Sequence, residues 1–104
     1  MGDAAKYSVL VSGRARSMLF DHAAFLAQVS INAGEALFDE FEEKVKSLEV
    51  MPERCSFYDN QFIKHGKYRK LSLGQHLLIL FQIIGDKVYI ELIIDVRAEN
   101  KNLN

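Results

Sequence analysis

The sequence has a single cysteine and a single proline, and its charges nearly cancel. Cys55 cannot form a disulfide within the chain, and one thiol cannot supply the ligand set of a cysteine zinc site. We expect Cys55 to be a small buried hydrophobe. The formal net charge of −1 argues against a surface devoted as a whole to phosphate binding, although it permits a local basic patch.

Long apolar runs are also missing. The longest lies within Leu77–Ile84 and is far shorter than the roughly 20 residues that a membrane-spanning helix needs. The first residues lack the apolar core of a signal peptide. We therefore expect a soluble protein of a reducing, cytoplasmic compartment with no membrane partner. A length of 104 residues predicts one domain, with 1–6 and 98–104 as loose termini.

Three strand-like segments follow one another in the second half of the chain. They are Tyr68–Leu73, Leu77–Ile84 and Val88–Val96, and the dipeptide Gly85-Asp86 before the last one is a hairpin signal. Such short turns predict an antiparallel meander. The middle segment is apolar on both faces, so the rest of the chain has to cover it from both sides.

The first half predicts one strand followed by a helix. The two-residue period of a strand places Tyr7, Val9 and Val11 on one face and Ser8, Leu10 and Ser12 on the other. Gly13 ends the strand, and Ser12 or Gly13 can cap a helix that begins at Arg14 or Ala15. The stripe expected to face the core comprises Leu19, Ala23, Leu26 and Val29 or Ser30, widened by Met18, Phe20 and Phe25.

A second helix is predicted from Asn32, which has Glu35 at the spacing of a capping box. Pro52 follows the end of this helix, and the segment Glu53–Gly66 has no clear period. Because that segment carries many large apolar groups, we expect it to pack along the core. Its apolar residues are Cys55, Phe57, Tyr58, Phe62 and Ile63. The core stripe of the second helix is Ala33, Leu37, Phe41, Val45 (or Lys44) and Leu48.

The predicted order is thus β-α-α-β-β-β. Helices that follow each other after a short link form an antiparallel hairpin, and a hairpin on one face of a sheet gives an α+β fold. We expect this two-helix hairpin to pack on a mainly antiparallel four-stranded sheet. The first strand has to pair with one of the last three, because it is not stable alone in water.

Several phrases in this order resemble the RelE/ParE superfamily of type II toxins, which are often called plasmid stabilisation proteins. The likeness extends from about residue 7 to residue 97. The phrases are Tyr7-Ser8-Val9 with Ala15, the helix Ala33–Leu48, the run Ser47–Arg54, Lys67–Leu71, Leu77–Ile84, and Asp95-Val96-Arg97. The resemblance implies a growth-inhibiting toxin that is neutralised by a cognate antitoxin and uses no cofactor.

Members of this superfamily act in one of two ways, and the residues bear on the choice. RelE-like members cleave messenger RNA on the ribosome, and ParE-like members inhibit DNA gyrase. The candidate nuclease residues are Arg69, Lys70 and Arg97, but Leu78 stands where many nucleases have an arginine, and the tail 98–104 has no histidine or tyrosine. The set is incomplete, so gyrase inhibition is favoured. A ribosome-dependent endoribonuclease, or a non-toxic relative that only binds a partner, is the alternative.

The densest charge feature lies between residues 64 and 70. It can be a solvated edge strand on which lysines prevent edge-to-edge pairing, or a contact patch for an acidic surface. Strand alternation would place Lys67, Arg69 and Leu71 on one face and Tyr68 and Lys70 on the other. The candidate macromolecule-binding residues are Lys64, Lys67, Tyr68, Arg69, Lys70 and Arg97.

The three histidines give no metal-binding pattern. His22, His65 and His76 are too far apart in sequence to form a local ligand pair, and no carboxylate joins them at a helical spacing. The sequence therefore predicts no metal site. It leaves the oligomeric state and the choice between gyrase and ribosome open.

Overall fold

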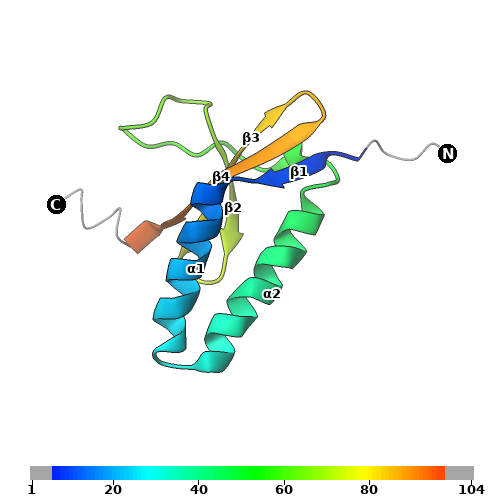
Figure 1. Cartoon of the computed structure of the whole chain (residues 1–104). Helices are drawn as coiled ribbons and strands as arrows, with labels where there is room; N and C mark the ends of the chain where they lie inside the picture. Colours follow the sequence, from blue (N-terminus) through cyan, green and yellow to red (C-terminus); the bar gives the residue numbers. More distant parts are fainter. Residues whose placement is uncertain (1–5, 98–104) are drawn as a thin grey trace.

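The computed structural model describes residues 6–97 and confirms the predicted α+β order (Figure 1). The expected loose termini therefore fall almost wholly outside the described residues. In chain order the elements are β1 (Ser8–Val11), α1 (Gly13–Ala27), α2 (Ile31–Ser47), the short 3₁₀ helix η1 (Pro52–Arg54), β2 (Arg69–Leu73), β3 (Leu77–Ile84) and β4 (Lys87–Asp95).

The four strands form one sheet in the order β1-β4-β3-β2. β2, β3 and β4 are the predicted antiparallel meander, and Gly85, with φ of 62°, makes the turn between β3 and β4. β1 pairs with β4 in parallel, so the expectation that the first strand joins one of the last three is confirmed. The sheet is mixed but mainly antiparallel.

Serine side chains begin both helices. The Ser12 hydroxyl accepts a hydrogen bond from the Ala15 amide at 2.9 Å, and the Ser30 hydroxyl accepts one from the Ala33 amide at 3.2 Å. The prediction that Asn32 caps α2 in a capping box with Glu35 is wrong, because Ser30 begins the helix two residues earlier. Ser30 is as good a cap as asparagine, and its use shortens the link between the helices.

The two helices lie side by side on one face of the sheet, with α1 against β4 and α2 against β2 (Figure 1). The prediction that Phe20 and Phe25 widen the core stripe is wrong, because both are more than half exposed, and of the two alternatives for the end of the stripe Val29 is 88% exposed and Ser30 is half-buried. Phe20 instead contacts the ring of Phe38 on α2, with centroids 5.2 Å apart. The core between helices and sheet contains Ala15, Leu19, Ala23, Leu37, Phe41, Leu48, Leu73, Ile79, Phe81, Val88, Ile90 and Ile93.

The other face of the sheet is partly covered by the segment 56–67. Tyr58 and Tyr68 bury Leu80 there, so the middle strand is covered from both sides as predicted. Residues 56–58 also pair with the outer edge of β2, since Tyr58 N donates to Tyr68 O at 2.8 Å and Lys70 N donates to Ser56 O at 3.0 Å. β2 is the last strand of the sheet, as the edge-strand interpretation expects, and residues 56–58 pair with part of its outer edge.

The apolar residues of this segment divide between core and surface. Cys55 and Tyr58 are buried and Ile63 is half-buried, as expected. Phe57 and Phe62 do not pack in the core, and Phe62 is 77% exposed. Phe57 forms a single β-bridge with Arg69 at the sheet edge, so its side chain and that of the buried Tyr58 point to opposite sides.

A β-bulge in β4 changes which side chains face the helices. Leu80 pairs with Leu92 and Phe81 pairs with Ile90, which leaves Glu91 as an extra residue. Ile90 and Ile93 consequently both enter the core under the helices. Glu91 and Leu92 both lie on the opposite face, which we call the open face.

Gly34 sets the distance between α1 and α2. A Cβ atom at this position would lie 2.9 Å from the Ala23 carbonyl oxygen and 3.2 Å from the Ala27 Cβ. We expect Gly34→Ala to lower the free energy of unfolding by about 1–3 kcal/mol through overpacking, although alanine is the better helix former by about 1 kcal/mol. Urea unfolding followed by circular dichroism measures this change.

Gly13→Ala is the matched control, because Gly13 is the first residue of α1 and nothing lies within 4 Å of an added Cβ. Its stability should stay the same or rise slightly. Equal stabilities of Gly34→Ala and the wild type would contradict the close helix contact.

Candidate functional site

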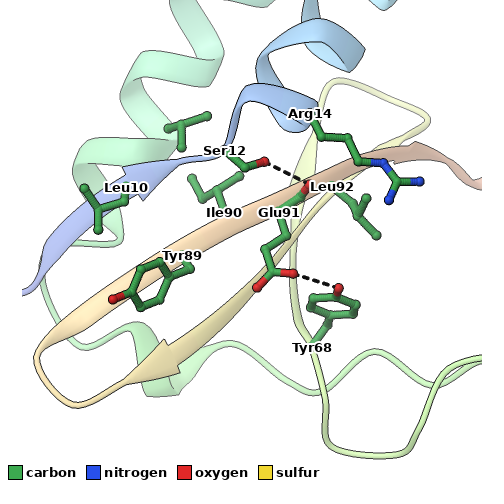
Figure 2. A pocket seen from close by; sticks show the side chains of 9 residues that line it. Leu10, Ser12, Arg14, Tyr68, Tyr89, Ile90, Glu91 and Leu92 are labelled. Carbon is green, nitrogen blue, oxygen red and sulfur yellow. Dashed lines mark hydrogen bonds between the residues drawn. The ribbon is translucent and has the colours of Figure 1, made fainter.

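The open face has a carboxylate at its centre. The Tyr68 hydroxyl donates to Glu91 Oε1 at 2.9 Å, and the Gln82 amide donates to Glu91 Oε2 at 2.5 Å (Figure 2). Three strands or their immediate flanks supply these groups, since Tyr68 precedes β2, Gln82 lies on β3 and Glu91 is the bulge residue of β4. Both oxygens are therefore fixed by neutral donors.

A hollow of about 390 Å³ lies beside this carboxylate. Figure 2 shows Leu10 and Tyr89 on one side of Glu91 and Tyr68 on the other. The Ser12 hydroxyl donates to the Glu91 carbonyl oxygen at 3.2 Å, which ties the start of α1 to the bulge and brings Arg14 to the rim. The hollow thus combines apolar walls with one acidic and one basic group.

The environment of Tyr68 favours its neutral hydroxyl. Burial, and then the hydrogen bond to Glu91 and its negative charge, raise the pKa of Tyr68, while the positive charge of Arg14 acts in the opposite direction. The ring is buried against Leu80. Tyr68 is thus a fixed wall of the hollow and a hydrogen-bond donor to the carboxylate.

Arg69, a candidate catalytic residue, fastens the preceding segment to the sheet. Its Nη1 donates to the Cys55 carbonyl oxygen at 2.6 Å and to the Glu53 carbonyl oxygen at 3.2 Å, and its guanidinium lies over the Phe57 ring at 4.1 Å from the centroid. The side chain is half-buried. Arg69 therefore has a structural role on the side of β2 that faces the helices.

Arg97 is bound to a neighbouring carboxylate. Its Nη2 donates to Asp95 Oδ2 at 2.9 Å and its Nε to Asp95 Oδ1 at 3.2 Å, and the hydrogen bond to Asp95 raises the pKa of Arg97. Arg69 pairs with Phe81 on β3, whereas Asp95 pairs with Leu77. That separation of four residues corresponds to about 13 Å along a strand, so the structure does not bring the two arginines together.

The lysines of the predicted patch are exposed but occupy two places. Lys64 and Lys67 border a second hollow that shares Tyr68 and Leu92 with the first, and the Lys67 ammonium lies 5.3 Å from the centroid of the Tyr68 ring. Lys70 borders a separate hollow at the β2 edge. Lys64 and Lys67 are therefore the members of the patch that adjoin the Glu91 site.

The remaining candidates have local partners. His65 Nδ1 lies 2.5 Å from Asp59 Oδ1, and His22 Nε2 lies 3.2 Å from the Ile93 carbonyl oxygen. Burial raises the pKa of the Cys55 thiol, which suits a small buried hydrophobe. Within residues 6–97, no group of three histidine, cysteine or acidic side chains is arranged to hold a metal ion.

Sequence reasoning missed Glu91, Gln82 and Arg14. A signal for Glu91 was present, because it is a single charge inside the apolar run VYIELII of a predicted strand. The bulge that turns Glu91 towards Tyr68 has no comparable signal. Arg14 was treated only as the start of a helix, and its place at the rim follows from the pairing of β1 with β4.

Replacing the carboxylate should change the titration of Tyr68. We expect the Glu91→Gln substitution to lower the pKa of Tyr68 towards the ordinary value, because it removes a negative charge and a strong acceptor but keeps the shape. NMR of ¹³C-labelled tyrosine follows this residue individually, with Lys87→Gln as a control on the same strand. An unchanged Tyr68 titration in Glu91→Gln would contradict the described contact.

The raised pKa of Tyr68 makes the stability of the fold depend on pH. A pKa that is raised in the folded state stabilises the fold below the ordinary tyrosine pKa of about 10, and this contribution is lost as pH rises through the raised value. Tyr7, which donates to Glu53, has a raised pKa and acts in the same direction. Stability should therefore fall above about pH 10, and it should fall less in Tyr68→Phe.

Comparisons with known proteins address the fold. No protein-family model and no curated protein matches the sequence. Among solved structures, the fold is similar to that of a chain in the chromosomal ParDE TA system from P. aeruginosa, with a TM-score of 0.66 and 17% sequence identity. The match covers 88% of this chain and 98% of that chain. Within residues 6–97, no helix has the length and apolar character needed to cross a membrane. The structural match establishes that the two chains share a fold.

Proposed function

We propose that this protein is the toxin of a type II toxin–antitoxin pair and that it inhibits growth by binding a macromolecule. The observation that carries this proposal is the fold shared over nearly the whole of both chains with a component of a ParDE toxin–antitoxin system. The phrases that resemble RelE/ParE toxins lie on or directly beside the elements that build this fold, from just before β1 to just after β4. A cognate antitoxin is accordingly the first expected partner.

The arrangement of the charged groups favours binding over RNA cleavage. Cleavage beside a 2′-hydroxyl needs a base and several cations that converge on one phosphate. Arg69 is engaged by backbone carbonyls and Arg97 by Asp95, while the open face has a carboxylate at its centre. A fixed negative charge repels phosphate, and a single misplaced cation lowers such a rate by about 100- to 1000-fold. We therefore favour the ParE-like target, DNA gyrase, over messenger RNA on the ribosome.

The exposed lysines supply the binding groups in this proposal. Lys64, Lys67 and Lys70 are all exposed, and Lys64 and Lys67 border the open face. Such cations at the rim of an interface accelerate association with an acidic surface and help to select it. An acidic segment of the antitoxin or of the target would meet these residues.

Induction of the gene in growing bacteria tests the proposal. We expect growth arrest, relief of the arrest by co-expression of the small protein encoded beside it, and co-purification of the two proteins. Lys64→Glu/Lys67→Glu should weaken the arrest at least tenfold in viable counts, because it reverses the charge of the rim without touching the core. Circular dichroism confirms that the variant is folded.

Arg16→Glu/Lys46→Glu is the matched control, since both side chains are exposed and lie on α1 and α2, which cover the opposite face of the sheet. It should arrest growth as the wild type does. Normal growth on induction of folded wild-type protein would contradict the toxin assignment and would leave a relative that only binds a partner. Equal loss of activity in the two double variants would show that the effect depends on net charge and not on the open face.

A further inference from the structure

We infer that Glu91 and its tyrosine walls form a receptor for one basic side chain, an arginine or a lysine, of a protein partner that covers the open face. The inference rests on the proposed function for the existence of such a partner. It adds the chemistry of an anchor point that the basic patch does not supply.

The first observation is a half-buried carboxylate, Glu91, that has no cationic partner among the described residues. Glu91 accepts hydrogen bonds from Tyr68 and Gln82, but within residues 6–97 no lysine or arginine forms an ion pair with it. The three ion pairs in that range involve Asp59, Asp86 and Asp95 instead. Each Glu91 oxygen keeps acceptor capacity after its one hydrogen bond, because a carboxylate has about four acceptor sites.

The second observation is the shape of the surroundings. Tyr68 and Tyr89 stand on either side of the carboxylate, and Leu10, which is 45% exposed, extends the apolar wall (Figure 2). Basic side chains place their methylene groups along apolar surfaces and their charge at a polar end, and cations are also attracted to aromatic faces. A hollow of about 390 Å³ with a carboxylate in its lining fits this pattern.

Removal of water from Glu91 on binding selects a positively charged residue of the partner. A partner that covers the hollow removes water from Glu91, and a carboxylate that is buried without a counter-charge is strongly unfavourable. A neutral or acidic residue would leave this penalty uncompensated, whereas a guanidinium offers two parallel hydrogen bonds to the two oxygens. Tyr68 and Gln82 keep those oxygens in place before binding.

Arg14 limits the site to a single cation. It lies at the rim of the same hollow, and within residues 6–97 it has no hydrogen bond or ion pair with another side chain. A second basic group beside Arg14 would be repelled. The preferred segment therefore carries one basic residue with apolar neighbours, the latter placed against Leu10 and Leu92.

NMR titration of the full ¹⁵N-labelled chain with N-acetyl-arginine amide tests the receptor directly. We expect saturable shifts of the amide signals of Tyr68, Tyr89 and Glu91, and binding at least fivefold weaker in Glu91→Gln. N-acetyl-citrulline amide has nearly the same shape without the charge, and it should bind at least fivefold more weakly to the wild type. Asp86→Asn removes an exposed carboxylate elsewhere and should leave the binding unchanged.

Equal shifts from the arginine and citrulline compounds, or unchanged binding in Glu91→Gln, would overturn the inference. This titration needs no toxin target, so it remains decisive if induction of the gene harms no cell. In the complex with the protein encoded beside the gene, Glu91→Lys should raise the dissociation constant at least tenfold. If Glu91→Lys leaves this dissociation constant unchanged while the arginine titration gives the expected result, the receptor binds a different protein partner.

Discussion

The need to bury β3 on both faces determines most of this structure. Ile79 and Phe81 point to the helices and Leu80 points to the segment 56–67, and all three are fully buried. Full burial of one such side chain contributes about 1.5–3 kcal/mol, which exceeds the 0.5–1.5 kcal/mol of a typical hydrogen bond. The helix pair and the irregular segment are therefore both required. Arg69 holds the start of this segment through the Glu53 and Cys55 carbonyl oxygens, so its structural role follows from the same need to cover β3.

The bulge in β4 links this core to the surface. One extra residue lets Ile90 and Ile93 both pack beneath the helices, and it places Glu91 among Tyr68 and Gln82 on the other side. A regular strand would alternate faces without interruption and could not meet both demands. The position of the carboxylate on the open face is thus a consequence of how the core is filled.

The fold could be predicted from the sequence because its signals are local. A two-residue period predicted β1, strand-like runs between short turns predicted β2, β3 and β4, helical stripes predicted α1 and α2, and Gly85-Asp86 predicted the last turn. The site could not be predicted to the same extent, because its contacts join distant residues. Arg69 has the basic character expected of a functional residue, but its partners are carbonyl oxygens 14 and 16 residues earlier in the chain. The exposure of Phe20 likewise depends on how two helices share one sheet face.

These features together support the proposal that the sheet is a platform that binds a macromolecule instead of cleaving it. Its exposed lysines lie at a rim, its two candidate arginines have structural partners, and its centre is acidic. The most direct test compares two activities of the purified protein, namely inhibition of DNA supercoiling by gyrase and cleavage of messenger RNA on translating ribosomes. The account predicts inhibited supercoiling with intact messages. Cuts in the messages at the decoding site, with gyrase activity unchanged at excess protein, would contradict it.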